Sequence, residues 1–308
     1  MKKRILIILT VAVAFITLTA CTHTPMPTTE VQHSPMPDVS DDITSEPIAE
    51  ASSMPEPTPI VAVTPIPSPK TESTPAQSAR LDVITIKGIE YDTGLTEFDL
   101  GGKLLSNADI EPLCKMTSLT KLRLNDNYIS DINVLVKLKN LTDLDLSGNQ
   151  ISDISALNGL TNLVSLTLDD NQQITDISAL RGLTKLTYLS LWCSQVSDIS
   201  ALSGLTSLKS LTLYGCPISS IDTLKDLTNL TFLWIDSTSV TDISALSGFV
   251  NLTDLNLSHN PIGDISPLKG LVNLKTLIIK NDPMDSPVND EQIAELKDAL
   301  PDCLVVQW

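Results

Sequence analysis

A 22-residue period in the C-terminal two thirds of the chain constrains the fold more than any other feature. The segment L-T-K-L-R-L-N-D-N-Y-I-S-D-I-N-V-L-V-K-L-K-N at 119–140 is followed by L-T-D-L-D-L-S-G-N-Q-I-S-D-I-S-A-L-N-G-L-T-N at 141–162. The pattern restarts at Leu163, Leu186, Leu208, Leu230, Leu252 and Leu274, and an imperfect earlier unit starts at Leu95. Such a period indicates one supersecondary unit that stacks on copies of itself in a row.

Each unit carries seven apolar positions that we expect to point inward. In one unit they are Leu141, Leu144, Leu146, Ile151, Ile154, Leu157 and Leu160. One unit alone buries too little apolar surface to offset the ordering of its backbone, so its stability requires neighbours. The spacing L-x-x-L-x-L-x-x-N-x-L is the leucine-rich repeat template. It predicts an α/β repeat solenoid of about nine repeats from residue 95. We expect an arc with a parallel concave β-sheet, and short 3-10 or irregular segments on the convex side.

Two polar columns accompany the leucines. In the first column we expect the side-chain amide to point inward and to hydrogen-bond the backbone of the bend, since a buried polar group must be satisfied. This column contains Asn127, Asn149, Asn171 and Asn260, with Ser194, Cys216 and Thr238 in the middle repeats. The second begins a D-I-S or D-I-N bend and consists of Asp131, Asp153, Asp176, Asp198, Asp242 and Asp264. We expect these aspartates to cap turns, with calcium binding as the alternative.

The two ends of the row need separate protection, because an open stack exposes core and strand edges. At the C-terminal end, within 285–308, Asn289 and Gln292 predict a capping box for a helix from about Asp290 to Leu300. A last strand is expected within 303–308. At the other end, residues 83–91 are expected to form a short strand that leads into the first repeat.

Residues 1–21 are typical of a secretory signal peptide. Three basic residues precede an uncharged apolar run at 5–20, which is short for a bilayer span. The run ends in Leu18-Thr19-Ala20-Cys21, which resembles the lipobox of bacterial lipoprotein precursors. The resemblance implies that Cys21 is lipidated, that the mature protein is anchored to the bacterial cell membrane, and that the folded part lies outside the cytoplasm. An uncleaved anchor with a chance cysteine is the alternative.

The segment 22–80 carries 12 of the 19 prolines and no hydrophobic period. Its composition predicts a disordered linker. Such a linker would span about 40 Å as a flexible coil and about 180 Å as polyproline II. A ligand for a proline-binding domain is the alternative. The leucine-rich repeat domain is then expected at 81–308.

Charge and composition exclude several functions. The formal net charge of −17 disfavours nucleic acid, because Lys and Arg supply most of the affinity for it. Only three histidines occur, two of them in the linker, and no phosphate-binding loop or metal-ligand spacing appears. His259 shows no partner base or nucleophile in the sequence. We therefore expect neither an enzyme nor a cofactor or metal.

The repeats resemble those of a known family. The segments I-T-D-I-S-A-L-R-G-L-T-K at 174–185 and V-S-D-I-S-A-L-S-G-L-T-S at 196–207 look like the internalin-type repeats of bacterial surface proteins. The resemblance covers about residues 95–284. It implies a curved solenoid used for protein recognition and sometimes for adhesion, without assigning a particular receptor.

The concave columns of three adjacent repeats are aromatic, whereas the neighbouring repeats are polar there. We call this set the aromatic patch; it consists of Tyr188, Trp192, Tyr214, Phe232 and Trp234. Exposed aromatic clusters with polar rims are typical of recognition hot spots. We therefore predict a ligand-binding surface for a protein, bordered by Asp236 and Asp254. The acidic border favours a ligand with Lys or Arg near apolar groups.

Other interpretations of the concave face remain open at this point. The rings could serve only to pair across strands. They could also stack on sugar rings, which would make the protein a carbohydrate-binding surface protein. A cation is a further candidate ligand, for the set Asp143, Asp145, Asp169 and Asp170, although no loop encloses it.

Overall fold

The computed structural model describes residues 82–192, 194–279 and 288–307. These residues belong to one compact unit, Ala79–Trp308. The predictions for the signal peptide at 1–21, for Cys21 and for the linker at 22–80 lie outside the described residues.

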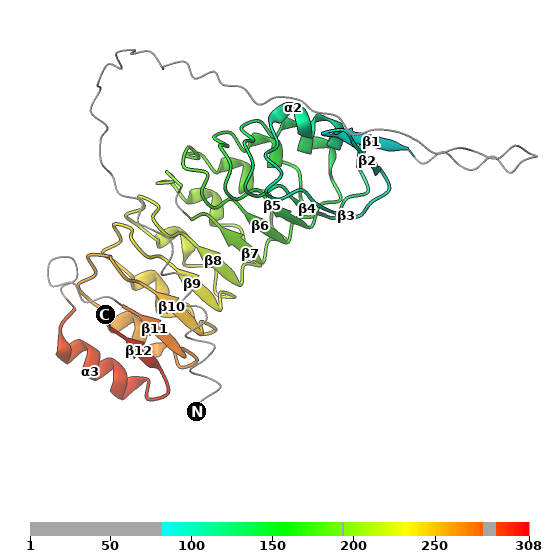
Figure 1. Ribbon diagram of the computed structural model, residues 1–308. Coiled ribbons are helices and arrows are strands. Elements are labelled where there is room, and N and C mark those ends of the chain that lie inside the picture. The colour runs from blue at the N-terminus through cyan, green and yellow to red at the C-terminus, as the bar shows by residue number, and fades with distance from the viewer. Residues whose placement is uncertain (1–81, 193, 280–287, 308) are drawn as a thin grey trace, which may run out of the picture. The chain divides into compact units, whose positions relative to one another are not determined.

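One parallel sheet runs through the unit, and its strand order follows the chain order from β3 to β12 (Figure 1). Its strands are β3 Glu97–Asp99, β4 Lys121–Arg123, β5 Asp143–Asp145, β6 Ser165–Thr167, β7 Tyr188–Ser190, β8 Ser210–Thr212, β9 Phe232–Trp234, β10 Asp254–Asn256, β11 Thr276–Ile278 and β12 Leu304–Val306. Equivalent positions of successive repeats lie side by side in the register. The α/β repeat solenoid predicted from the leucine period is confirmed.

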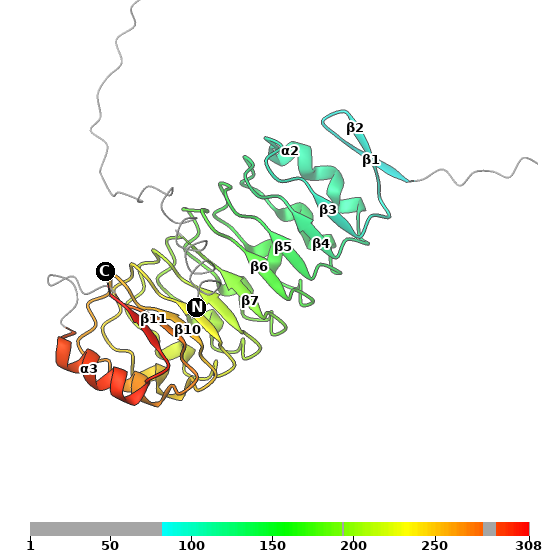
Figure 2. The same cartoon turned by 60° about the horizontal axis from the view of Figure 1, so that its bottom comes forward.

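Short 3-10 segments form the opposite side of each repeat (Figure 2). They are η1 Glu111–Lys115, η2 Asn133–Lys137, η3 Ser155–Leu157, η4 Ser178–Leu180, η5 Ser200–Leu202, η6 Asp222–Leu224, η7 Ser244–Gly248 and η8 Ser266–Gly270. The predicted aspartates cap them: Asp153 Oδ1, for example, accepts the backbone N–H of Ser155 at 2.7 Å. These hydrogen bonds lower the pKa of the Asp153, Asp198, Asp242 and Asp264 carboxyls. Turn capping therefore accounts for this column.

The core lies between the sheet and the 3-10 segments. The middle residue of each repeat strand, such as Leu144 in β5 and Leu233 in β9, is buried, and its two strand neighbours point to the concave face. Leucine and isoleucine from every repeat join one continuous cluster. Because each side chain packs against equivalents in the next repeat, no single repeat holds a core of its own.

The buried asparagine column connects the repeats as expected. Asn149 Nδ2 donates to the carbonyl of Leu146 in its own repeat at 3.0 Å and to that of Leu124 in the preceding repeat at 2.9 Å. Its Oδ1 accepts the backbone N–H of Ile129. In the middle repeats the substitute side chains make fewer of these bonds: Cys216 Sγ donates to the carbonyl of Leu191 and contacts Ser194 Oγ at 3.3 Å.

The C-terminal end is closed as predicted. The helix α3, Asp290–Ala299, begins after Asn289, whose side chain accepts the N–H of Gln292 while the Gln292 side chain accepts the N–H of Asn289. Its Ile293 and Leu296 are buried, and β12 then adds the last strand to the sheet.

The prediction for the N-terminal end was wrong in part. Residues 83–91 do not form one strand leading into the sheet; β1 Val83–Ile86 and β2 Ile89–Asp92 make a separate antiparallel hairpin. The chain reverses at Lys87 and Gly88, which both have positive φ, as this tight turn requires. Ile84 and Ile86 join the core, so the hairpin covers the first repeat, together with α2 Asn107–Ile110.

A left-handed residue follows most strands. The third residue after the strand has a φ between 54° and 67° at Asp126, Gly148, Asp170, Gly215, Ser237 and His259. This conformation turns the chain sharply out of the sheet. It costs a residue with a Cβ about 1–2 kcal/mol, which the surrounding packing must offset.

We expect Asn171→Ala to lower the free energy of unfolding by about 2–4 kcal/mol, because the buried N–H of Ile151 loses its acceptor and two repeats lose a shared link. Urea titration followed by circular dichroism measures this. Asn140→Ala, which removes an exposed amide bonded to the carbonyl of Thr117, is the control and should cost less than about 1 kcal/mol. Equal effects of the two changes would contradict the role given to the buried column.

Leu104 offers a test of backbone strain, since it has a φ of 55° and is 61% exposed. We expect Leu104→Gly to be more stable than Leu104→Ala by about 1 kcal/mol, because only Ala keeps the Cβ that the left-handed conformation disfavours. Thermal unfolding of the two variants gives the comparison. A more stable alanine variant would mean that this turn relaxes without strain.

Candidate functional site

The residues of the aromatic patch belong to β7, to β9 and to the segments just after β7 and β8. Tyr188 and Phe232 occupy the same column, on either side of Ser210. Trp234 lies in the next column, beside Thr212. The leucines between them in the strands, such as Leu189, are fully buried. Tyr188, Phe232 and Trp234 therefore face away from the core, on the concave side of the sheet. Trp192 and Tyr214 lie in the segments that follow β7 and β8.

The rings form two contacting pairs. The Trp192 and Tyr214 ring centroids lie 5.4 Å apart with an interplanar angle of 86°. Those of Phe232 and Trp234 lie 5.0 Å apart at 30°, a stacked arrangement. Both geometries are favourable for aromatic rings. Four rings are half-buried against each other and the sheet, while Tyr188 is 39% exposed. Within each of these two pairs the rings pack against each other.

The C-terminal border of the patch differs from the expected open acidic rim. Asp236 is only 8% exposed, and its carboxylate accepts hydrogen bonds from Asn256 Nδ2 and Ser237 Oγ. His259 Nδ1 lies 2.8 Å from Asp236 Oδ1, so the histidine that looked isolated in the sequence has a carboxylate partner. The two residues are 23 positions apart, in equivalent loops of adjacent repeats, which is the signal that would have paired them. Asp254 is half-buried and accepts from Thr253 Oγ1.

The N-terminal border is acidic and joined to the patch by the backbone. Asp169 Oδ1 accepts the backbone N–H of Trp192 at 2.8 Å, and the carbonyl of Trp192 accepts the N–H of Asp170 at 2.8 Å. Burial raises the pKa of the Asp169 carboxyl, and the charges of Asp170 and Asp145 add to this effect. Burial also raises the pKa of Tyr188, helped by the charge of Asp169.

The candidate cation cluster on the concave face does not form a metal site. In the part of the chain that the structure describes, no three His, Cys, Asp or Glu side chains converge as metal ligands would. Asp143 and Asp145 are instead engaged locally, by the hydroxyls of Thr142 and Ser147 respectively.

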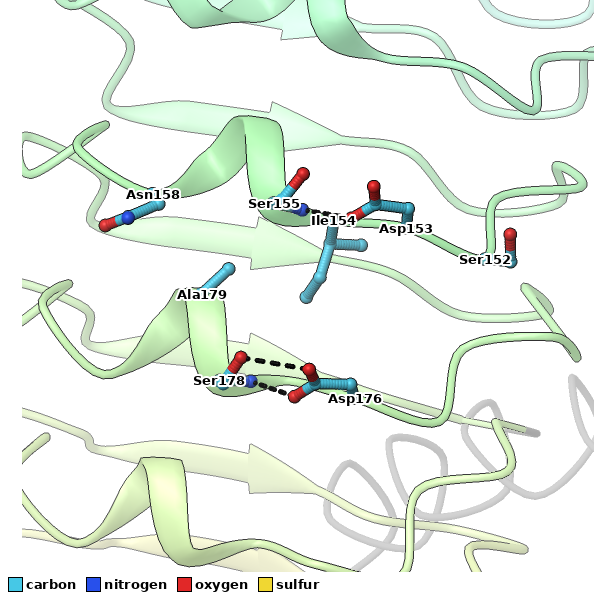
Figure 3. Close-up of a pocket in the computed structure, with 8 residues that line it drawn as sticks. All are labelled: Ser152, Asp153, Ile154, Ser155, Asn158, Asp176, Ser178 and Ala179. Atoms are coloured by element: carbon cyan, nitrogen blue, oxygen red, sulfur yellow. Dashed lines mark hydrogen bonds between the residues drawn. The ribbon is translucent and has the colours of Figure 1, made fainter.

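A polar pocket of about 370 Å³ lies on the other side of the solenoid, between η3 and η4 (Figure 3). Small side chains such as Ala179 leave the space open. Its two carboxylates, Asp153 and Asp176, already accept the N–H groups of Ser155 and Ser178. Both carboxylates of the pocket are therefore engaged in capping turns, and the pocket lies on the side of the repeats opposite the sheet.

The remaining candidate groups are the cysteines. The thiols of Cys114, Cys216 and Cys303 are free, while Cys193 lies outside the described residues. Within the described ranges, no helix is long and apolar enough to cross a membrane.

Comparison with known sequences identifies the repeats. A model described as leucine rich repeat matches residues 93–151, and one described as leucine rich repeats in two copies matches 139–182, 161–204, 184–226, 206–248 and 250–288. The comparison with curated proteins finds no match.

Solved structures extend the comparison. Internalin C2 from Listeria monocytogenes is 33% identical over 62% of this chain and 84% of that chain, with a TM-score of 0.58. The functional domain of InlJ from the same organism is 24% identical over 70% of this chain and 44% of that chain, with a TM-score of 0.58. A plant receptor kinase ectodomain from Arabidopsis thaliana is 24% identical over 61% of this chain and 25% of that chain, with a TM-score of 0.53.

The last two similarities show the fold alone, whereas the first also relates the sequences. Since leucine-rich repeat models match most of 93–288 and a third of the aligned residues are identical to internalin C2, this chain belongs to the internalin-like leucine-rich repeat proteins.

Proposed function

We propose that this protein recognises a protein ligand through the aromatic patch. The observation that supports the proposal is that aromatic side chains occupy concave positions of β7 and β9 and the segments just after β7 and β8, and that four of them form two contacting pairs outside the core. Aromatic side chains bring large contact areas at a small cost in rotamer entropy, and they dominate binding hot spots. Two mutually packed ring pairs make that cost smaller still.

The fold supports recognition more than catalysis. Leucine-rich repeat proteins are in general binding scaffolds, and the plant receptor ectodomain with the same fold was solved in complex with CASPARIAN STRIP INTEGRITY FACTOR 2. The paired His259 and Asp236 are bound to each other beside the patch, and Asp236 is occupied by two further donors. Among the described residues, the side-chain contact given for His259 is with Asp236, so this pair supports a role in the rim of the patch.

We further propose that the protein is secreted and held on the bacterial membrane by lipid at Cys21. The support is the sequence around Cys21 and the basic, apolar segment before it. Two or more acyl chains anchor a protein stably where one chain is marginal. The proline-rich segment 22–80 would then act as a spacer that presents the repeat domain to ligands.

Carbohydrate binding is a second candidate for the same surface. It is favoured by the exposed ring of Tyr188 and by neighbouring acceptors such as Asp254, because aromatic faces stack on sugars and carboxylates bind their hydroxyls. A protein ligand fits better, since the patch is a face and not an enclosed slot.

We expect the double change Trp192→Ala and Trp234→Ala to leave the protein folded and to weaken ligand binding by about 100-fold, the effect of losing two hot-spot rings. Pull-down with the full-length protein, followed by affinity measurement on the captured ligand, tests this. Tyr128→Ala removes a 58% exposed ring outside the patch and is the matched control. Unchanged binding by the double variant would place the ligand elsewhere, and saturable binding on a glycan array that the double variant loses would favour sugar.

We expect Cys21→Ser to move the protein from the membrane fraction to the soluble or uncleaved precursor fraction, because the hydroxyl cannot take the thioether-linked lipid. Cells are grown with a radiolabelled fatty acid and then fractionated. The distribution of the protein between fractions gives its location, and its radioactivity shows whether it carries lipid. Cys303→Ser is the control, since that thiol lies at the far end of the repeat domain. Persistent labelling of the Cys21→Ser protein would overturn the assignment.

A further inference from the structure

An Asn-Gly pair lies in the turn at 157–160, on the convex side of the solenoid. Asn158 follows η3 with φ −58° and ψ 119°, and Gly159 comes next with φ 89°. The N–H of Leu160 donates to the carbonyl of Leu157 at 3.0 Å, so these four residues form a type II turn. Glycine occupies the position of this turn that requires a positive φ. The backbone nitrogen that follows Asn158 therefore belongs to a residue without a Cβ to shield it.

The peptide between Asn158 and Gly159 is turned over relative to the equivalent peptides of the next repeats. Arg181, Ser203 and Lys225, which follow η4, η5 and η6, have ψ angles between −33° and −29°. Both orientations therefore occur in turns of the same repeat. Rotation of this one peptide about ψ of Asn158 swings the Gly159 nitrogen past the side chain of Asn158.

The groups on both sides of this peptide are not held by hydrogen bonds. Asn158 is exposed, and in the part of the chain that the structure describes neither its side-chain amide nor the N–H of Gly159 makes a hydrogen bond. Asn140, by contrast, donates to a carbonyl of the preceding repeat. The side chain of Asn133 also makes no hydrogen bond with described residues, but the β-branched Val134 follows it. Asn158 thus combines an unbound carboxamide with an unshielded backbone nitrogen.

We propose that Asn158 is a site of spontaneous deamidation in the folded protein. The Gly159 nitrogen loses its proton to solvent base and forms a bond to Cγ of Asn158, and the Cγ–Nδ2 bond breaks as ammonia leaves. Water then opens the resulting succinimide ring at either carbonyl and gives aspartate or isoaspartate. The reaction consumes only water and needs no oxidant, reductant or enzyme. It is independent of the ligand recognition proposed above.

The modification changes the convex side of the solenoid. Asn158 lines the pocket between η3 and η4, together with Asp153 and Asp176 (Figure 3). Each conversion adds one carboxylate to this lining. Isoaspartate also carries the main chain through its side-chain carbons, which lengthens the backbone between η3 and β6. The added charge makes the converted protein separable from the original protein by anion exchange.

The test incubates the full-length protein for several weeks in mildly alkaline buffer made with oxygen-18 water. Mass spectrometry of proteolytic peptides locates the incorporated oxygen, and an isoaspartate-specific methyltransferase measures isoaspartate. We expect conversion at Asn158 to be about tenfold faster than at Asn133, because Gly159 lacks the Cβ that shields the nitrogen of Val134. Equal rates at the two asparagines, or no incorporation at Asn158, would overturn the proposal.

A variant and a second condition separate this turn from the rest of the fold. Asn158→Ser places here the Ser-Gly pair that Ser203 and Gly204 form in a later repeat, so the protein should fold as before. Isoaspartate should then disappear from this peptide, with circular dichroism unchanged. The same incubation in urea gives the rate for the unfolded chain. Conversion of the wild-type protein in urea alone would show that the folded turn protects Asn158, and the proposal would be wrong.

Discussion

The burial of one leucine face between neighbouring repeats is the constraint on which the rest of the structure depends. A strand of three residues and a short 3-10 segment have no independent stability, so each repeat takes its form from the contacts that it shares. The asparagine column fixes how neighbouring repeats are aligned, because the amide of a residue such as Asn149 donates hydrogen bonds to carbonyls of two repeats. The regular register of the sheet follows, and with it the columns of side chains on the concave face.

The leucine period was sufficient to predict the parallel sheet, the capped convex turns and the outward-facing strand positions such as Tyr188 and Phe232, because these depend only on position within the repeat. The hairpin β1–β2 was missed, since its Lys87–Gly88 reversal lies outside the periodic part. The contacts of Asp169 with Trp192, and of Asp236 with His259, were missed for a different reason. They involve side chains or backbone of loop residues that follow the strands, whose directions the apolar pattern does not encode.

The net charge of the chain is a poor guide to its recognition surface. The value of −17 disfavours polyanions, but it averages over carboxylates with different roles. The carboxylates of the convex column accept hydrogen bonds from N–H groups of the turns, and the Asp236 carboxylate accepts hydrogen bonds from neighbouring side chains. Asp169, which follows β6, accepts the backbone N–H of Trp192 and forms no ion pair within the described residues, so individual carboxylates and not the total charge decide the character of each face.

The middle of the solenoid combines the rings with a break in the amide column. Ser194, Cys216 and Thr238 follow β7, β8 and β9, the three strands of the aromatic patch, and they link successive repeats through fewer hydrogen bonds than the asparagines on either side. Among the described residues, fewer side-chain hydrogen bonds of this column therefore join the repeats of β7, β8 and β9 than join the asparagine-containing repeats on either side. A ligand bound to these aromatic rings would contact several of the less strongly linked repeats at once. Its binding would therefore make the middle of the solenoid more rigid.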